Sequence, residues 1–493
     1  MGKRVTSWMF CILVATGPAG CGIQPAAEES RRETENPVVW SVQAHTARAD
    51  RRPPSTGMMA LSDSVKVTTS PSIAQWGFRP HRQYLHRTNL EVDPIGVGVA
   101  IYDDVVSGDF NGDGRTDLVA LANQNFVDLI LQTSSGTLAA PITFSAGVIN
   151  YSTAKLIVVD DFNEDGIKDV AFDTVSDDGY RGGVGLLLSR AGQVPSFKQG
   201  YPALAYMSCD SPGDWTSLDV DGDGHKDIVV AGGCPEHLNA SQGSCNSNYC
   251  LIYQVLHGDG RGNFGRPTYA IAEGLEGGMS EIMVEDVNRD GLLDLVFVGT
   301  ESDPYAGSVR VAYRLPGGGL SPLHELHALL GNLTSETHII FGDVDGDKRR
   351  DTVSGDEIHL RNADGTFGEA LGLAMNFSYP ITPFIADFNG DGLDDLVNHQ
   401  FEDFDLIPYL AVYLGKGGDL NPPIRFYDPN PDWGHAFKVS YDRYPYAAGD
   451  FNQDGCLDLA IAVGYDGLAI LDGVNCIPRP RRLTGGNLPP RRL

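Results

Sequence analysis

Residues 109–117 read DFNGDGRTD, and this acidic loop decides the fold because close copies of it recur along the chain. The shared pattern is D-x-[DN]-x-D-G-x-x-D. Copies begin at Asp109, Asp161, Asp219, Asp286, Asp343, Asp387 and Asp450. The copy at Asp343 departs from the pattern only at Lys348, which replaces the glycine. Seven copies at intervals of 44 to 67 residues predict seven repeats of one structural unit.

The spacing inside each copy suits a divalent cation held by oxygen. Side-chain oxygens at positions 1, 3 and 5, the carbonyl of position 7 and a carboxylate at position 9 can converge on one Ca²⁺, which takes six to eight such ligands. The predicted ligands are Asp109, Asn111, Asp113, Arg115, Asp117, Asp161, Asn163, Asp165, Ile167, Asp169, Asp219, Asp221, Asp223, His225, Asp227, Asp286, Asn288, Asp290, Leu292, Asp294, Asp343, Asp345, Asp347, Arg349, Asp351, Asp387, Asn389, Asp391, Leu393, Asp395, Asp450, Asn452, Asp454, Cys456 and Asp458. Acids that merely face solvent would not repeat one internal spacing seven times.

The fifth copy is the exception within the series. Position 6 needs a positive φ for the sharp turn, and glycine adopts it without steric cost. Lys348 lacks that freedom, although its loop offers four carboxylates. We therefore expect this site to be strained or differently filled.

The residues around each loop read as strands rather than helices. Position 12, which is Glu in an EF-hand, is Ala120 in the first copy and is not Glu in any of the others. The first loop instead runs into LVAL after Asp117, then VDLILQ from Val127 and PITF from Pro141. Short apolar runs separated by glycine turns indicate buried strands. Four strands in each unit of about 57 residues are typical of a propeller blade.

The repeated DFNGDGxxDL, followed by a strand and a GDGxF-type turn, resembles the FG-GAP/VCBS repeat. This is the calcium-binding blade of the integrin α-subunit propeller and of many exported bacterial proteins. The resemblance covers about residues 80–477 and implies an all-β, seven-bladed β-propeller, placed here at residues 76–477. It also implies up to seven Ca²⁺, each in the loop between the first and second strands of a blade. The chain lacks the Gly-Ala-Pro segment of the integrin motif, so it is closer to the bacterial form and integrin-like ligand binding does not follow.

The charge balance bears on possible partners. The chain has 65 acidic and 36 basic residues, a formal net charge of −29, which argues against nucleic acid as the main partner. Seven bound Ca²⁺ would cancel 14 of these charges. The acidity is therefore in large part the charge of the predicted metal sites.

The N-terminus predicts export. Residues 1–21 read as a signal peptide, with Lys3 and Arg4 before a short apolar run. The small residues that end in Cys21 resemble a lipoprotein cleavage site, so Cys21 is the expected lipidation site and the protein an outer-membrane or cell-surface lipoprotein, touching the membrane through the lipid anchor only. The alternative is a freely secreted protein cleaved near Ala19. Residues 22–75 read as a disordered tether, and residues 478–493 as a disordered, basic, Pro-rich tail.

Two features predict how the ring is completed. The last unit lacks a fourth strand, and residues 82–92, which precede the first loop, have strand character without a blade of their own. We expect them to close the last blade as its outer strand. The six cysteines after Cys21 predict three local disulfides, which is one of fifteen possible pairings. These pairs are Cys209 with Cys234, Cys245 with Cys250, and Cys456 with Cys476.

The sequence favours a non-enzymatic binding or adhesion module for a protein or glycan at the cell surface. It contains no G-x-S-x-G, H-E-x-x-H, P-loop or Rossmann motif. Candidate contact segments are residues 234–250 and the connection that carries Tyr427, Trp433 and His435. The alternative is a carbohydrate-active protein on the same scaffold, either a polysaccharide lyase or a lectin. A lyase needs a base, and His338 and His399 are the histidines nearest to the loops that we consider for this role.

Overall fold

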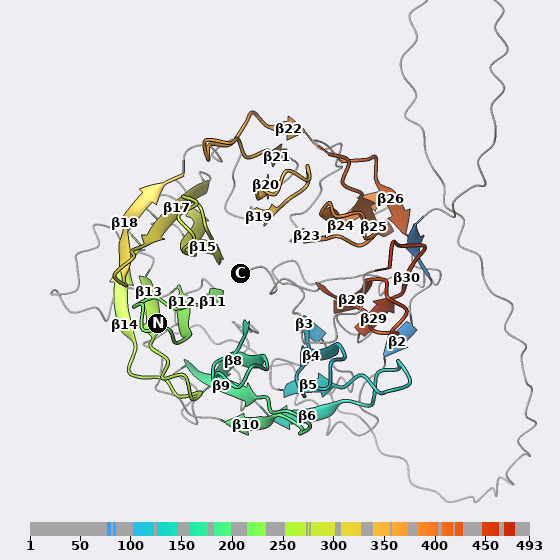
Figure 1. The fold of residues 1–493 in the computed structure, drawn as a ribbon, viewed down its shortest axis with the longest axis horizontal. Helices are drawn as coiled ribbons and strands as arrows, with labels where there is room; N and C mark the ends of the chain where they lie inside the picture. The colour runs from blue at the N-terminus through green and yellow to red at the C-terminus, as the bar shows by residue number, and fades with distance from the viewer. Residues whose placement is uncertain are drawn as a thin grey trace, which may run out of the picture. The chain divides into compact units, whose positions relative to one another are not determined.

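The computed structural model describes residues 76–79, 82–84, 102–122, 126–145, 158–175, 182–198, 214–232, 252–272, 275, 278–300, 307–326, 339–354, 357–372, 383–402, 407–417, 420–426, 446–462 and 468–478. Within these ranges the chain forms strands and no helix, and seven four-stranded sheets surround a common centre (Figure 1). The prediction of an all-β, seven-bladed propeller is confirmed. No helix among the described residues is long and apolar enough to cross a membrane.

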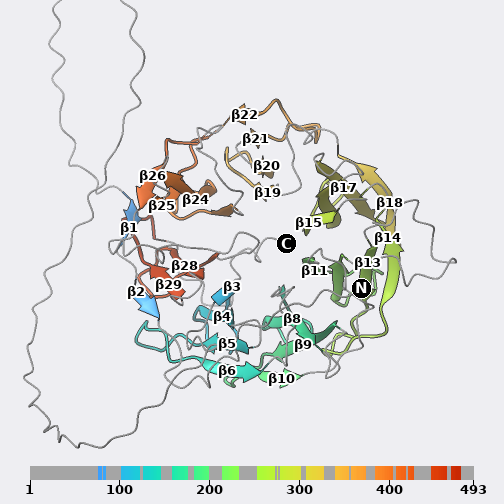
Figure 2. The same cartoon turned by 180° about the vertical axis from the view of Figure 1, so that it is seen from behind.

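Blades 1 to 6 each use four strands that follow one another in the sequence, and all neighbours pair antiparallel (Figure 2). Blade 1 is β3 (Tyr102–Gly108), β4 (Asp117–Ala122), β5 (Phe126–Ile130) and β6 (Ile142–Ser145). Blade 2 is β7 (Val158–Asp160), β8 (Asp169–Val175), β9 (Gly182–Leu188) and β10 (Ser196–Lys198). Blade 3 is β11 (Asp214–Leu218), β12 (Asp227–Ala231), β13 (Ile252–Leu256) and β14 (Thr268–Ile271). Blade 4 is β15 (Gly278–Glu285), β16 (Asp294–Thr300), β17 (Gly307–Arg314) and β18 (Leu320–Glu325). Blade 5 is β19 (Ile339–Gly342), β20 (Asp351–Ser354), β21 (Glu357–His359) and β22 (Leu371–Gly372). Blade 6 is β23 (Phe384–Ala386), β24 (Asp395–Glu402), β25 (Ile407–Tyr413) and β26 (Ile424–Phe426).

Blade 7 combines strands from both sides of the ring sequence. Its inner three strands are β27 (Tyr446–Gly449), β28 (Asp458–Ala462) and β29 (Leu468–Leu471), and its outer strand is β2 (Arg82–Tyr84). β2 pairs antiparallel with β29 over three residues. The segment expected to supply this strand, residues 82–92, is described only as far as Tyr84.

A second N-terminal strand was not anticipated from the sequence. β1 (Gly77–Phe78) pairs with β30 (Gly473–Val474) in a small sheet of its own. Beside it, Trp76 donates its indole N–H to the carbonyl of Phe388 in blade 6, at 3.1 Å. The N-terminal segment therefore spans the seam between blades 6 and 7.

The hydrophobic core lies between the blades, as the two-residue period of a strand dictates. In β4 every side chain is buried, and successive residues point to opposite neighbours. Leu118 and Ala120 pack in the cluster shared with blade 7, whereas Val119 and Leu121 pack in the cluster shared with blade 2. A strand buried on both faces must be apolar throughout, which explains the unbroken LVAL that follows the first acidic loop.

Several predicted features lie outside the described residues. These are the signal and tether up to residue 75, Cys21, Cys209, Cys234, Cys245 and Cys250, the segment 234–250, the tail from residue 479, and Tyr427, Trp433, His435 and His338.

Candidate metal loops at the blade junctions

The seven acidic loops all connect the first and second strands of a blade, as the resemblance implied. They are loop 1 (109–117), loop 2 (161–169), loop 3 (219–227), loop 4 (286–294), loop 5 (343–351), loop 6 (387–395) and loop 7 (450–458), numbered as their blades. In every loop the position-1 carboxylate folds the chain back, because one of its oxygens accepts the backbone N–H of position 6 at 2.8 to 3.2 Å. The position-5 carboxylate accepts the N–H of position 7 in the same way in all seven loops.

The position-9 aspartate has a structural role that its place in the motif does not predict. Asp117 is fully buried, and its two oxygens accept different backbone N–H groups, from Phe110 at 3.1 Å and from Gln132 at 2.8 Å. The carboxylate thus holds the loop against the end of the third strand. All seven blades repeat this arrangement. Each carboxylate oxygen has two lone pairs, so these hydrogen bonds leave room for a cation.

Burial of these carboxyl groups makes their negative charge costly. Burial raises the pKa of Asp117, Asp169 and Asp395 to about 7 and that of Asp351 to about 6. It raises the pKa of Asp458 to about 8, and the nearby charge of Asp472 adds to the effect. Repulsion from other carboxylates of the same loop contributes to these raised pKa values. A cation in the loop would offset this repulsion and keep the buried groups ionised.

The donor set of the loops fits Ca²⁺. In loops 3 and 5 the carboxylate oxygens of positions 1, 3 and 5 all lie within 4.8 Å of one another. In the other five loops position 3 is Asn, whose side-chain oxygen accepts the N–H of position 5 and so lies inside the turn. Hard oxygen donors that surround one point are what Ca²⁺ selects.

Loops 1 and 5 differ from the others because they contain an arginine at position 7. The guanidinium of Arg115 pairs with Asp113 in its own loop, and Arg115 Nε donates to the carbonyl of Gln132 at 2.9 Å. Arg349 pairs with Asp347 in the same manner. These two residues were predicted as ligands through their carbonyls only. Their side chains place a positive charge beside a carboxylate that a cation would use.

Loop 5 forms the same turn as the other loops in spite of Lys348. Lys348 has a φ of 68°, and its N–H donates to Asp343 at 3.0 Å, as the glycines of the other loops do. A non-glycine residue in this region costs about 1 to 2 kcal/mol. Position 4 is also left-handed where it is not glycine, with φ of 58° to 64° at Glu164, Arg289 and Gln453.

Each acidic loop is bound by the next blade around the ring. The donors are backbone N–H groups of that blade in five cases and side chains in two. In each pair the donor of the next blade is named first and the loop residue whose carbonyl accepts is named second: Gly192 and Asn111, Gly262 and Phe162, Gly319 and Val220, Arg361 and Val287, Asp394 and Asp343, Ile477 and Asn389, and Gln132 and Asp450. The last contact joins blade 1 to loop 7, so the series runs around the whole ring. The acidic loops are therefore the junctions between blades.

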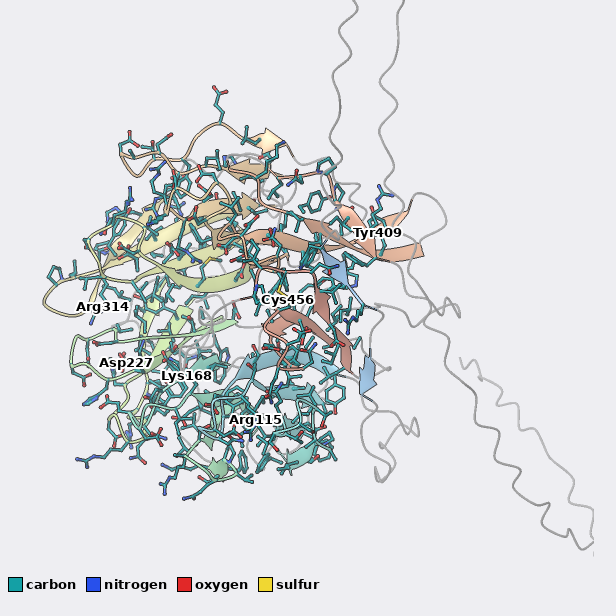
Figure 3. The ribbon with its side chains drawn as sticks, turned by 45° about the vertical axis from the view of Figure 1, so that its right-hand side comes forward. Arg115, Lys168, Asp227, Arg314, Tyr409 and Cys456 are labelled. Carbon is teal, nitrogen blue, oxygen red and sulfur yellow. A yellow bond between two sulfur atoms is a disulfide. The ribbon has the colours of Figure 1, made fainter. Side chains whose placement is uncertain are left out.

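Ion pairs reinforce two of these junctions. Lys226 of loop 3 and Lys168 of loop 2 both pair with Asp160, which precedes loop 2. Lys168 is labelled in Figure 3. Arg350 of loop 5 pairs with Glu285, which precedes loop 4, at 2.8 Å. In both cases the side chain at position 8 of a loop pairs with the residue that directly precedes the acidic loop of the previous blade.

The family comparison agrees with this architecture. A family model described as FG-GAP-like repeat matches residues 109–172 and 219–297. The chain contains FG-GAP-like repeats. Its two matched regions include loops 1, 2, 3 and 4 and the strands that follow loops 1 and 3.

Solved structures were compared as well. The chain is 13% identical to Bacillus licheniformis rhamnogalacturonan lyase PL11, with 82% of this chain and 76% of that chain covered and a TM-score of 0.47. It is 11% identical to the V. cholerae biofilm matrix protein Bap1, with 84% and 92% covered and a TM-score of 0.37. No curated protein matches the chain.

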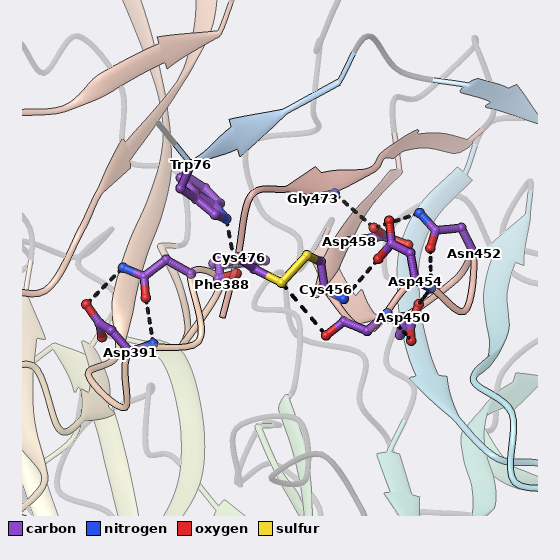
Figure 4. Close-up of a disulfide and its surroundings, with 12 residues drawn as sticks. Trp76, Phe388, Asp391, Asp450, Asn452, Asp454, Cys456, Asp458, Gly473 and Cys476 are labelled. Atoms are coloured by element: carbon purple, nitrogen blue, oxygen red, sulfur yellow. Dashed lines mark hydrogen bonds between the residues drawn. A yellow bond between two sulfur atoms is a disulfide. The ribbon is translucent and has the colours of Figure 1, made fainter. Parts of the chain in front are cut away.

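Blade 7 carries a disulfide at its acidic loop (Figure 4). Cys456, at position 7 of loop 7, is joined to Cys476, and their Cα atoms are 5.7 Å apart. This is one of the three predicted pairs, and the other four cysteines lie outside the described residues. The next residue, Ile477, donates its N–H to Asn389 of loop 6 at 2.7 Å. The disulfide thus links loop 7 to a segment that reaches loop 6.

One candidate base is buried in the core of blade 6. His399 is 2% exposed and its Nδ1 bonds the hydroxyl of Tyr446, which is equally buried. Burial lowers the pKa of His399 to about 3. A histidine that is neutral and enclosed in this way does not reach a substrate, so it offers no support for the lyase alternative.

Proposed function

We propose that this protein is a calcium-stabilised β-propeller that acts as a non-enzymatic binding or adhesion module. The observation that carries the calcium role is the contact between every acidic loop and the following blade. A cation in such a loop stabilises a junction between two blades as well as the turn itself. Up to seven Ca²⁺ would then hold the ring together.

The expected size of this effect is large. Extracellular calcium modules bind with Kd of about 0.1 to 1 mM. At about 1 mM free ion and a Kd of about 0.1 mM, each site adds about 1.4 kcal/mol. Several such sites rival the roughly 5 to 15 kcal/mol by which ordinary domains are stable.

Thermal unfolding of the metal-depleted full chain tests the calcium role. We expect the Tm to rise with Ca²⁺ and to fall in excess chelator, with a much weaker response to Mg²⁺, which demands octahedral geometry. The Asp387→Ala variant should lose part of the calcium response, because Asp387 is position 1 of loop 6. Asp364→Ala removes the same charge from an exposed turn outside the loops and is the matched control. A Tm that changes neither with added Ca²⁺ nor with excess chelator would refute the proposal.

We also propose that the N-terminal strands close the ring. β2 adds the fourth strand to blade 7, and Trp76 and Phe78 pack against Phe388 and Phe426 of blade 6. Deletion of residues 1–75 should leave the Tm unchanged, whereas deletion of residues 1–95 should lower it markedly. Equal melting of the two truncated proteins would count against closure.

For the location we propose export and anchoring through a lipid on Cys21, with free secretion as the alternative. Mass spectrometry of the mature N-terminus separates the two, since a start downstream of an unmodified Cys21 excludes the anchor. The ligand would be a protein or a glycan at the cell surface, with no nucleic acid bound. Glycan-array binding together with an absorbance assay for unsaturated lyase products tests the carbohydrate alternative. Retention of a glycan without product indicates a lectin, and product formation indicates a lyase.

A further inference from the structure

Blade 3 brings a histidine to its acidic loop. His257 follows β13 and directly precedes Gly258, whose N–H donates to the position-9 carboxylate of loop 3. In blades 1, 2, 5 and 6 a leucine directly precedes the corresponding donor. Its Nδ1 lies 3.3 Å from Oδ2 of Asp221 and 3.5 Å from Oδ2 of Asp227. The three side chains form a group whose ligand atoms all lie within 4.8 Å of one another. The imidazole thus joins positions 3 and 9 of loop 3.

The hydrogen bonding of His257 leaves this nitrogen directed at the carboxylates. Its Nε2 lies 3.2 Å from the hydroxyl of Thr268, and in the tautomer in which Nε2–H donates to that hydroxyl, Nδ1 keeps its lone pair. Nδ1 is shielded from solvent and has no hydrogen-bond partner among the described residues. A lone pair that faces two carboxylate oxygens is repelled unless a positive charge lies between them.

The distances match metal coordination better than direct hydrogen bonds. Charge-assisted N–H···O bonds measure about 2.7 to 2.9 Å. Two ligands of one tetrahedral ion with metal–ligand bonds of about 2.0 to 2.2 Å lie about 3.3 to 3.6 Å apart. Both observed separations, 3.3 and 3.5 Å, fall in the second range.

A neighbouring arginine already pairs with another carboxylate of loop 3. Arg314 of blade 4 lies with Nη2 3.0 Å from Oδ2 of Asp219, the position-1 carboxylate of loop 3. Asp219 is therefore already neutralised by a protein side chain. The carboxylates of Asp221 and Asp227 remain, next to the imidazole.

We propose that Asp221, Asp227 and His257 form a site for a divalent first-row transition ion of the Zn²⁺ class. An imidazole nitrogen favours such ions, whereas Ca²⁺ takes oxygen ligands. The Nε2 bond to Thr268 is the outer hydrogen bond that commonly orients a metal-binding histidine. The inference rests on the proposed function to the extent that Asp221 and Asp227 also belong to the calcium loop. The other six loops are unaffected by it.

Metal titration of the full chain tests the site. The metal-depleted protein is first given Ca²⁺ to fill the other six loops and is then titrated with Zn²⁺ by calorimetry, in which Zn²⁺ displaces any Ca²⁺ held by loop 3. A parallel titration with Co²⁺ is followed by visible absorption, which reports nitrogen ligation. We expect one Zn²⁺ per chain in the wild type, and binding weakened by about ten- to hundredfold or more in His257→Leu. Leucine is the residue that four other blades carry at this place, so the variant should fold.

The matched control is His324→Leu, which removes an exposed histidine of blade 4 outside the acidic loops. This variant should bind Zn²⁺ like the wild type. Asp221→Asn, which keeps the size of the side chain, should weaken Zn²⁺ in the same way as His257→Leu and gives a second reading if that variant does not fold.

Three results would overturn the site: no stoichiometric Zn²⁺ in the wild type, binding that survives in His257→Leu, or binding that is lost in His324→Leu instead. The calcium dependence of the Tm, measured on the same samples, separates this inference from the proposed function. A normal calcium response without Zn²⁺ binding removes only the transition-metal site. Zn²⁺ binding without any calcium response removes only the calcium role.

Discussion

Lys226 Nζ lies 3.0 Å from Oδ2 of Asp160, so a side chain of loop 3 neutralises the carboxylate that precedes loop 2. Asp160 is almost fully buried, forms a second ion pair with Lys168 and accepts a hydrogen bond from the hydroxyl of Ser217. Burial alone would raise the pKa of Asp160, but the two lysines outweigh it and the net pKa is lowered. The junction between blades 2 and 3 therefore depends on charges supplied by both blades.

Lys226→Met should lower the free energy of unfolding by about 1 to 2 kcal/mol. Breaking a fully buried pair costs more, but Lys226 is about one-third exposed and Lys168 remains. Denaturant unfolding measures the loss. In an Asp160→Asn background the same substitution should cost much less, and an equal cost in both backgrounds would exclude the pair as the cause.

Gly318→Ala should destabilise the ring by about 3 kcal/mol, because a Cβ there would lie 1.7 Å from the carbonyl oxygen of Asp221 and φ is +85°. Gly317→Ala in the same turn should be nearly neutral, since a Cβ there meets nothing within 4 Å. Thermal unfolding of the two variants compares them directly. Similar losses for both would show that loop 3 does not need this close approach.

Removing the arginine of loop 1 or loop 5 should strengthen calcium binding. In Arg115→Leu and Arg349→Leu the guanidinium no longer competes for Asp113 or Asp347, and Leu already occupies position 7 of loops 4 and 6. We expect calorimetry to find about tenfold tighter binding at one site, which corresponds to about 1.4 kcal/mol. Arg190→Leu removes an exposed arginine outside the loops and should change nothing. Unchanged isotherms in all three variants would contradict the role of the guanidinium.

His399 should make the protein sensitive to acid. The folded protein holds the pKa of His399 at about 3, while the unfolded chain takes up the proton near pH 6.5. Between these values the unfolded state binds more protons, so stability falls as the pH falls, by at most about 1.4 kcal/mol per pH unit. His399→Gln should flatten this part of the pH profile of unfolding. His324→Gln changes an exposed histidine and should not, so parallel profiles for His399→Gln and the wild type would reject the assignment.

Loss of the disulfide should destabilise the last blade. Cys456 and Cys476 close a loop with a separation of 20 residues, for which chain entropy predicts about 3 kcal/mol. The double variant with Ala at both positions should melt lower than the wild type, and addition of a reductant should lower the Tm of the wild type by more than that of the variant. A Tm that resists both changes would contradict the prediction.

Much of the fold follows from the sequence because it depends on local patterns. The nine-residue spacing fixes where each loop lies, and runs such as LVAL after Asp117 mark strands that are buried on both faces. The number of loops then gives the number of blades. The family comparison supports the same repeats in the first four units.

The remaining features depend on partners far away in the sequence. Asp117 reads as a ligand, and only the fold shows that its oxygens hold Gln132 at the end of the third strand. His257 has no spacing relation to loop 3 that a motif search detects, since 30 residues separate it from Asp227. The arginines at position 7 of loops 1 and 5 can be read from the sequence. The motif uses only the backbone carbonyl at that position, so it does not predict that the guanidinium groups pair with Asp113 and Asp347.

The origin of β2 has a mechanical consequence for the ring. Among the described strands, each of the other six blades is one continuous stretch of chain, whereas blade 7 takes its outer strand from before β3. Tension between the two ends of the chain is therefore carried by the three residue pairs of β2 and β29 and the two of β1 and β30. We expect these few pairs to separate first under load. The Cys456–Cys476 disulfide then still holds the segment after β30 to loop 7. A protein held at a surface by its N-terminus would thus yield first at blade 7 and leave six blades intact.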